Sequence, residues 1–421
     1  MEAIVNQSAA GGNYKVTYTN AHKPNSVVQP SYYMEASSEF ITRKLLPYAE
    51  DLFESATPFI RVRTHVPDDK FLKMLQLITR VAQWSKNDWP HISRLQQLFH
   101  AGSFEYLRDQ LKRYVASNPM LPLENELDFY RAIHWIFLRF WEPFAIGEPT
   151  LVQQSIDISA AISGYTQAQL TEMVAEFSPI LQDWDREIAD RMAQFMRVVP
   201  TLVPVYTVQF YREFDKERDD ILSSYGLSTA RFEDIRGLYQ DLFETTFRLS
   251  PLMVAHNNII HRGALNMMPP GFGRTATIKD YSALRTGNKI EKLTQPKKPS
   301  EKLDELIELP LSTVVRNAIG HARWDYNPVL QQITYDTGAN YLLEFALEIP
   351  RLLRTMLGLW ELVYKVREWE YVSRGVLPSI DFSRRPKTLS TSNTAKKKGP
   401  KSKKSAEKQK RKRSRRARVK R

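Results

Sequence analysis

The chain contains no cysteine, and this absence alone excludes several kinds of site. With no Cys among 421 residues, disulfides, cysteine zinc sites, iron–sulfur clusters and thiol catalysis are all ruled out. The absence fits a reducing compartment without establishing one, and we expect a cytoplasmic protein. The first residues, MEAIVNQSAAGGNYKV, have no basic patch followed by an apolar core, so we expect no secretory signal.

Long hydrophobic runs are also missing. The most apolar stretch, RAIHWIFLRFWEPFAIGEP, is short for a membrane span and carries Arg139 and Glu142. We interpret it as a buried helix and expect no membrane partner. An apolar fraction of 42% and an aromatic fraction of 11% indicate a globular chain. Its length allows two or three domains with a large core.

Positive charge is concentrated at the C-terminus. Residues 396–421 contain 16 Lys and Arg against one acid, Glu407, which gives this segment a charge of +15. The whole chain carries +13, so the remaining residues carry only −2. The segment has no Leu, Ile, Phe, Tyr or Trp, so it buries too little apolar surface to fold alone, and we expect a disordered basic tail.

Such a tail favours an anionic partner. RNA or DNA fits best, because phosphate contacts release counterions and need no particular shape. A nuclear-import signal, a ribosome-binding segment and a solubilising tail are the other interpretations. We expect RNA to be bound by ten residues of the tail: Lys396, Lys397, Lys398, Lys403, Lys404, Arg411, Lys412, Arg413, Arg415 and Arg416.

Hydrophobic periodicity indicates an all-α fold. From about residue 36 onward, apolar residues recur at the three- and four-residue spacing of helices, and no fixed repeat period emerges. We expect a flexible arm over 1–30, a helical domain of unknown role over 31–227 and a second helical unit over 228–375. A linker and the basic tail fill 376–421. The second unit is predicted to hold about four helices, with a short hairpin insertion after His321.

Most candidate sites have ordinary explanations. The stretch PPGFGR lacks the preceding strand and the following Lys-Ser/Thr of a phosphate loop, and we interpret it as a loop. His256 and His261 are separated by about 140° on a helix, which suits a shared metal poorly. A third ligand is not evident, so we expect no metal and no cofactor. The acids of QDWDREIAD (Asp183, Asp185 and Asp190) are interpreted as a solvated helix surface.

An arginine followed closely by a histidine occurs twice, and only context separates the two pairs. Arg94 and His100 lie in SRLQQLFH, at a spacing that turns the two side chains to opposite sides of a helix, so we interpret this pair as a chance match. The second pair, Arg316 and His321, lies in RNAIGH at the end of an apolar helical stretch.

RNAIGH places three polar side chains together. Asn317 and His321 are four residues apart and therefore share a helix face, while the long fork of Arg316 can reach the same phosphate. Gly320 suits a local helix break or a close backbone approach. Four apolar residues are expected to anchor the segment: Leu311, Val314, Val315 and Ile319.

At these residues the chain resembles HEPN domains, the higher-eukaryote-and-prokaryote nucleotide-binding family. RNAIGH matches their pattern of arginine, a polar residue, three to five further residues and histidine. The following ARWDYNPVLQQITYD also resembles the aromatic and acidic turn and hairpin of some bacterial members. The resemblance covers about residues 228–375, a third of the chain.

The resemblance implies an all-helical bundle that forms a homodimer, so that two motifs face each other. It also implies a metal-independent endoribonuclease in which the RNA 2′-hydroxyl attacks the adjacent phosphorus. His321 would act as general acid or base, Arg316 would hold the scissile phosphate, and Asn317 would orient either one. Bacterial members act in antiviral defence or toxin–antitoxin systems, which implies a possible antitoxin or regulatory partner.

Two alternatives stay open. Arg, Asn, Gly and His are common at helix ends for structural reasons alone. Some HEPN domains are non-catalytic, so the chain also fits a nucleic-acid-binding or scaffold protein with a basic tail. An unrelated helical scaffold with such a tail is the third interpretation.

Overall fold

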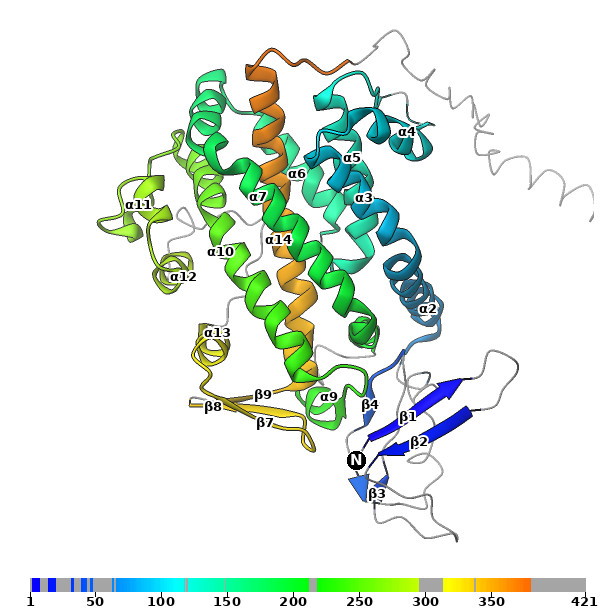
Figure 1. The fold of residues 1–421 in the computed structure, drawn as a ribbon. Helices are drawn as coiled ribbons and strands as arrows, with labels where there is room; N and C mark the ends of the chain where they lie inside the picture. The colour runs from blue at the N-terminus through cyan, green and yellow to red at the C-terminus, as the bar shows by residue number, and fades with distance from the viewer. Residues whose placement is uncertain are drawn as a thin grey trace, which may run out of the picture.

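The computed structural model describes residues 2–7, 14–19, 32–33, 39–43, 46–47, 63, 66–116, 118, 120–147, 149–211, 218–294, 313–336 and 338–379. Within these ranges the chain is mostly helical, with small antiparallel sheets at the lower end of the view in Figure 1. The predicted all-α fold is thereby confirmed. The expected basic tail lies outside the described residues.

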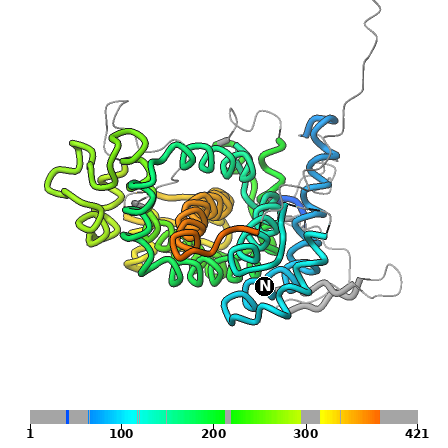
Figure 2. The backbone as a smooth tube through the Cα atoms, turned by 90° about the horizontal axis from the view of Figure 1, so that it is seen from above, coloured from blue at the N-terminus to red at the C-terminus, as the bar shows by residue number. Residues whose placement is uncertain are grey.

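A bundle of long helices surrounds one central helix. The central helix is α14 (Leu342–Ser373), and α5 (Glu126–Trp141), α6 (Leu151–Ser163), α7 (Gln167–Leu202) and α10 (Phe232–Arg262) pack around it. Figure 2 looks down the bundle and shows α14 inside the ring of the other helices. Most side chains of α14 are buried, which explains why its sequence lacks a clear polar face.

The helices α2 (Asp68–Gln83), α3 (Trp89–His100) and α4 (Phe104–Val115) lie along one side of the bundle (Figure 1). One π-helical turn, η1 (Trp84–Asp88), joins α2 to α3. Shorter helical segments complete the described chain: η2 (Glu142–Phe144), α8 (Val205–Val208), α9 (Arg218–Ser224), η3 (Pro270–Phe272), α11 (Ile278–Ser282), α12 (Thr286–Thr294) and α13 (Thr313–Gly320).

Local sequence signals explain several helix ends. The hydroxyl of Thr166 accepts from the backbone N–H of Gln169, whose side chain accepts in return from the N–H of Thr166. This capping box satisfies two donors that the first turn of α7 would otherwise leave free. The chain also breaks between α3 and α4, because α3 ends at His100 and Gly102 has φ of +68°, a conformation that favours glycine.

The two predicted helical units share one hydrophobic core among the described residues. Helix α7 runs antiparallel to α10: Arg248 donates to Glu187 in the second half of α7, and Thr229, just before α10, donates to the carbonyl of Thr201 near the end of α7. Ser178 of α7 likewise meets Glu370 near the end of α14. Helix α7, which belongs to the predicted 31–227 unit, therefore packs against helices of the predicted 228–375 unit. The domain boundaries stay predictions.

Two buried pairs of polar side chains attach α14 to its neighbours. His134 of α5 lies 2.6 Å from the carboxylate of Glu361 through Nε2, and Arg367 donates to Asp185 of α7 at 2.8 Å. Burial raises the pKa of Asp185 to about 6, and the nearby Arg367 opposes that rise. Burial would likewise raise the pKa of Glu361, but His134, Lys365 and Ser155 together outweigh burial, and the pKa is lowered. Asp185 is thus a buried partner of Arg367, which corrects the expectation of a solvated acid; Asp183 and Asp190 are exposed.

Short strands form small sheets. The strands β1 (Glu2–Gln7) and β2 (Tyr14–Thr19) pair antiparallel within the predicted N-terminal arm. After His321, β7 (Trp324–Asn327), β8 (Gln332–Tyr335) and β9 (Gly338–Tyr341) form an antiparallel sheet in that order, which confirms the predicted hairpin and adds a third strand. Four two-residue strands form the remaining pairs: β3 (Tyr32–Tyr33) with β5 (Leu46–Pro47), and β4 (Thr42–Arg43) with β6 (Tyr225–Gly226).

No helix in the described ranges is both long enough and apolar enough to cross a membrane. The apolar stretch that sequence reasoning assigned to a buried helix forms α5, and most of its residues are buried.

Candidate functional site

The predicted motif lies on a short helix at one end of the bundle. Helix α13 packs against α10 through Ala318 and Ile319, which are 8% and 5% exposed. Val315 is half-buried beside them. Of the four expected anchors, Leu311 lies outside the described residues, as does the side chain of Val314. The buried face leaves Asn317 and Gly320 exposed, so α13 presents its polar side outward.

The guanidinium of Arg316 is already held by neighbouring side chains. Its Nε donates to Oε1 of Glu244 at 2.8 Å, and its Nη2 contacts the same oxygen. Its Nη1 donates to Oδ1 of Asn317 at 3.1 Å. Arg316 and Asn317 are therefore joined, as the motif required, and Glu244 of α10 fixes the direction of the arginine from 72 residues away in the chain.

Glu244 is the centre of a wider polar cluster. Thr286, the first residue of α12, donates its hydroxyl to the second carboxylate oxygen of Glu244 at 3.1 Å. Lys289 is 8% exposed, and its pKa is lowered by burial first and then by Arg248, against the opposing effect of Glu244. Sequence reasoning missed Glu244, Thr286 and Lys289, since no motif spacing connects them to RNAIGH.

His321 follows the last residue of α13 and is exposed. Its backbone N–H donates to the carbonyl of Asn317 at 3.0 Å, but its ring has no hydrogen-bond partner among the described residues. The structure thus places His321 on the same segment as Arg316 and Asn317, with an imidazole that solvent and ligands can reach. The side-chain link between Arg316 and Asn317 does not extend to it.

The helix break occurs at Ala322, which corrects the expectation for Gly320. Arg323 donates its backbone N–H to the carbonyl of Ala318 at 2.9 Å, and Ala322 donates to Ile319 at 3.2 Å. This is the Schellman arrangement, in which one residue takes the left-handed conformation. That residue is Ala322, with φ of 53°. Gly320 is helical, and an added Cβ would meet only the Arg316 guanidinium, at 3.9 Å or more.

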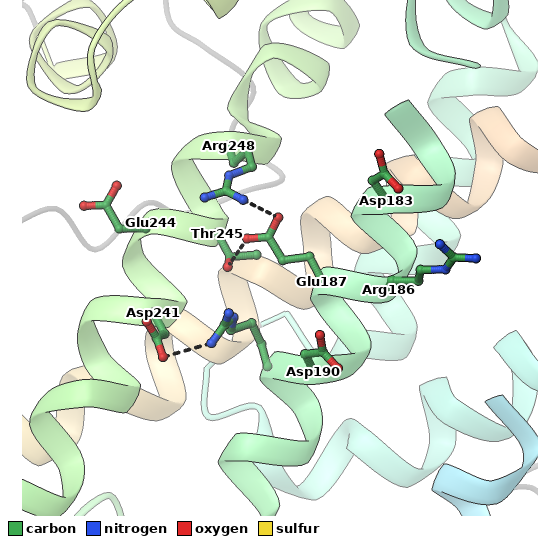
Figure 3. Close-up of a pocket in the computed structure, with 9 residues that line it drawn as sticks. Asp183, Arg186, Glu187, Asp190, Asp241, Glu244, Thr245 and Arg248 are labelled. Atoms are coloured by element: carbon green, nitrogen blue, oxygen red, sulfur yellow. Dashed lines mark hydrogen bonds and ion pairs between the residues drawn. The ribbon is translucent and has the colours of Figure 1, made fainter. Parts of the chain in front are cut away.

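A groove of about 350 Å³ lies between α7 and α10, on the other side of Glu244. Figure 3 shows Glu187 directed toward α10, where it meets Thr245 and Arg248, whereas Glu244 points away from α7. Arg191 pairs with Asp241 across the same groove at 2.9 Å. These pairs neutralise most of the lining charge. The groove is therefore a salt-bridged seam between the helices and adds no positive path for a phosphate backbone.

The other arginine–histidine pair, Arg94 and His100, has a different environment. Arg94 is exposed, whereas His100 is half-buried at the end of α3. Burial, assisted by Arg367 and Arg186, lowers the pKa of His100 to about 4. A histidine of that kind is neutral and structural near pH 7, as expected for a chance match.

No group of three or more His, Asp or Glu suited to a metal occurs within the ranges that the structure describes. His256 is buried and bonds the hydroxyl of Tyr165, while His261 is exposed, so this pair shares no site. The ten tail residues expected to bind RNA lie outside the described ranges.

No family model, curated protein or solved structure matches the chain. The resemblance to HEPN domains therefore rests on the residues of RNAIGH and on their helical setting.

Proposed function

We propose that the chain is a metal-independent endoribonuclease of the HEPN type. One observation supports the proposal most directly. The exposed imidazole of His321 follows α13, and Arg316 of that helix is held by both Asn317 and Glu244. In the proposed reaction the RNA 2′-hydroxyl attacks the adjacent phosphorus, leaving a cyclic phosphate and a 5′-hydroxyl. His321 transfers the proton, and Arg316 stabilises the charge that develops on the phosphoryl oxygens.

The proposal includes a homodimer. One motif supplies one histidine, whereas the reaction needs a base for the attacking oxygen and an acid for the leaving oxygen. Two motifs facing each other supply both groups. Sedimentation at assay concentration should give a dimer, and a fully active monomer would overturn this part of the proposal.

The biological setting belongs to the same proposal. We expect a cytoplasmic RNase whose basic tail holds RNA, acting in bacterial antiviral defence or with an antitoxin or other regulatory partner. These statements depend on the resemblance and on the charge of residues 396–421.

Cleavage of bulk RNA in EDTA tests the central claim. His321→Ala should abolish cleavage and leave the melting temperature within a few degrees, because an exposed polar residue contributes little to stability. His261→Ala is a matched control, since His261 is also exposed and lies near the end of a helix. Loss of activity in both variants, or in the control alone, would overturn the assignment.

A non-catalytic binding or scaffold protein is the second candidate. One observation favours it: Nε, Nη1 and Nη2 of Arg316 each already donate within the protein. Under this alternative Arg316 is a structural clamp between α13 and α10. RNA binding without any metal-free cleavage, together with a large stability loss in Arg316→Ala, would support it.

A further inference from the structure

A second groove, of about 560 Å³, lies where η1 meets α3, α4 and α5. Its lining includes Trp84 and Asp88 of η1, Tyr114 of α4, and Trp135 and Arg139 of α5. None of its lining residues belongs to α10, α12 or α13. Its volume is within the range of small-molecule sites, and π-helical turns such as η1 occur frequently at functional positions.

Aromatic rings form much of the lining. Trp84 and Trp135 are both half-buried. Trp84 stacks on Phe140 with ring centroids 5.6 Å apart and an interplanar angle of 13°, which fixes the indole plane. Trp135 lies 4.9 Å from the Arg139 guanidinium. Indole and guanidinium planes held in this way offer flat surfaces on which a planar heterocycle can stack.

Three arginines lie at or beside these rings. Arg139 is exposed at the groove, Arg80 lies 5.5 Å from the Trp84 ring, and Arg113 adjoins Tyr114 on α4. The lining itself contains one acid, Asp88, and one base, Arg139. The three arginines favour a ligand that carries an anionic group over a quaternary ammonium ion.

Asp88 has an unused carboxylate. It occupies the N-cap position of α3 but makes no side-chain capping bond, and no ion pair reaches it among the described residues. Burial and the negative charge of Asp88 both raise the pKa of the Tyr114 phenol, so this charge lies close to the groove. A carboxylate accepts two parallel N–H groups well, and guanine presents such a pair at N1 and N2 of its Watson–Crick edge.

We propose that this groove binds the base of a guanine nucleotide. The base stacks against Trp84 and Trp135, the Asp88 carboxylate accepts from its N1–H and N2–H, and Arg139 holds the phosphate. The site is distinct from RNAIGH and does not depend on the proposed ribonuclease activity.

Isothermal titration of the full chain with GMP tests the proposal, with AMP, CMP, ribose 5-phosphate and choline as comparison ligands. We expect saturable binding of GMP that exceeds binding of each comparison ligand. Trp135→Leu should weaken it by about tenfold or more, as expected for one lost stacking partner. Trp369→Leu is the matched control, because Trp369 is half-buried on α14 and lines no part of the groove.

Asp88→Asn tests the base contact separately, because it should reduce the preference for GMP over AMP. Asp88 is exposed, so this variant should still fold. His321→Ala should bind GMP as tightly as the unaltered chain does, so the test of this groove is independent of the test of ribonuclease activity. A single-stranded pentanucleotide with one G, compared with GMP, shows whether the base comes from RNA or from a free nucleotide.

Three results would overturn the proposal: no saturable binding of either guanine ligand, equal losses in Trp135→Leu and Trp369→Leu, or tighter binding of choline than of GMP. If Trp135→Leu does not fold by circular dichroism, Asp88→Asn and Arg139→Gln decide the matter. Unchanged GMP affinity in both of these exposed-site variants would also reject it.

Discussion

Replacing Glu244 by glutamine tests whether the cluster behind the motif positions Arg316. The glutamine keeps the size of the side chain but removes the charge that holds the guanidinium through Nε and Nη2. It also weakens the bond from Thr286. Because Glu244 acts on the proposed reaction only through Arg316, we treat it as a positioning residue.

The exposure of the pair sets the expected loss of stability. The side chains of Arg316 and Glu244 are 22% and 28% exposed, between a surface pair and a fully buried one. A charge-assisted hydrogen bond in that setting is worth about 1–2 kcal/mol, and we expect Glu244→Gln to lower the free energy of unfolding by that amount. An arginine released from its partner loses orientation toward the phosphate, which should lower kcat by about tenfold to a hundredfold.

The assay is metal-free RNA cleavage with kcat and KM measured separately, alongside urea unfolding. Glu187→Gln is the matched control. Glu187 also receives a hydroxyl, from Thr245 at 2.7 Å, and an arginine, Arg248 at 2.9 Å. It lies in the neighbouring seam and both of these bonds go to α10, so its loss should cost a similar stability and leave kcat unchanged.

An unchanged or increased kcat in Glu244→Gln, measured on a parent chain that cleaves RNA, would refute the reasoning. So would equal losses of kcat in Glu244→Gln and Glu187→Gln, because general destabilisation would then explain both.

Three further predictions follow from other parts of the chain. Ala322→Gly should raise the free energy of unfolding by about 1 kcal/mol in urea, because it removes the strain of a side chain at φ 53°; a loss of stability would contradict the left-handed cap. His100 has a folded pKa of about 4 against 6.5 when unfolded, so the unfolded chain binds its proton first. Its contribution to stability should be complete above pH 6.5 and lost as the pH falls toward 4, and His100→Gln should flatten that part of the profile. A chain ending at Ser392 should bind RNA more weakly, with a salt slope smaller by about 0.7 per lost phosphate contact and with kcat unchanged; a lower kcat with the same slope would place the tail in catalysis.

Much of the fold was readable from local signals. The threonine cap of α7, the glycine after α3 and the alternation in QQITYD are local sequence signals, and the structure has a helix start, a left-handed turn and a strand at these places. Such features depend on backbone capping, left-handed geometry and side-chain alternation, which the sequence shows directly. The two adjacent motif residues, Arg316 and Asn317, are likewise found in contact.

Features set by distant packing were not readable. Glu244 reaches Arg316 only because α10 and α13 pack together, and nothing near residue 244 marks it. Asp185 resembles its exposed neighbours in sequence, yet its position on α7 faces Arg367. Gly320 looked like the helix break, but the chain turns two residues later, at an alanine that the Schellman hydrogen bonds hold in place.

The buried polar pairs of α14 restrict both the movement of this helix and the substitutions that it can accept. The pairs His134–Glu361 and Asp185–Arg367 attach it to two different helices, so sliding or rotating it would break two buried polar contacts at once. Losing one partner of such a pair costs about 3–5 kcal/mol, whereas replacing both by apolar residues of similar volume is often neutral. At these four positions, replacing both partners of a pair should therefore be tolerated, whereas replacing one partner alone should destabilise the fold. The position of α14 along its axis is thus strongly constrained.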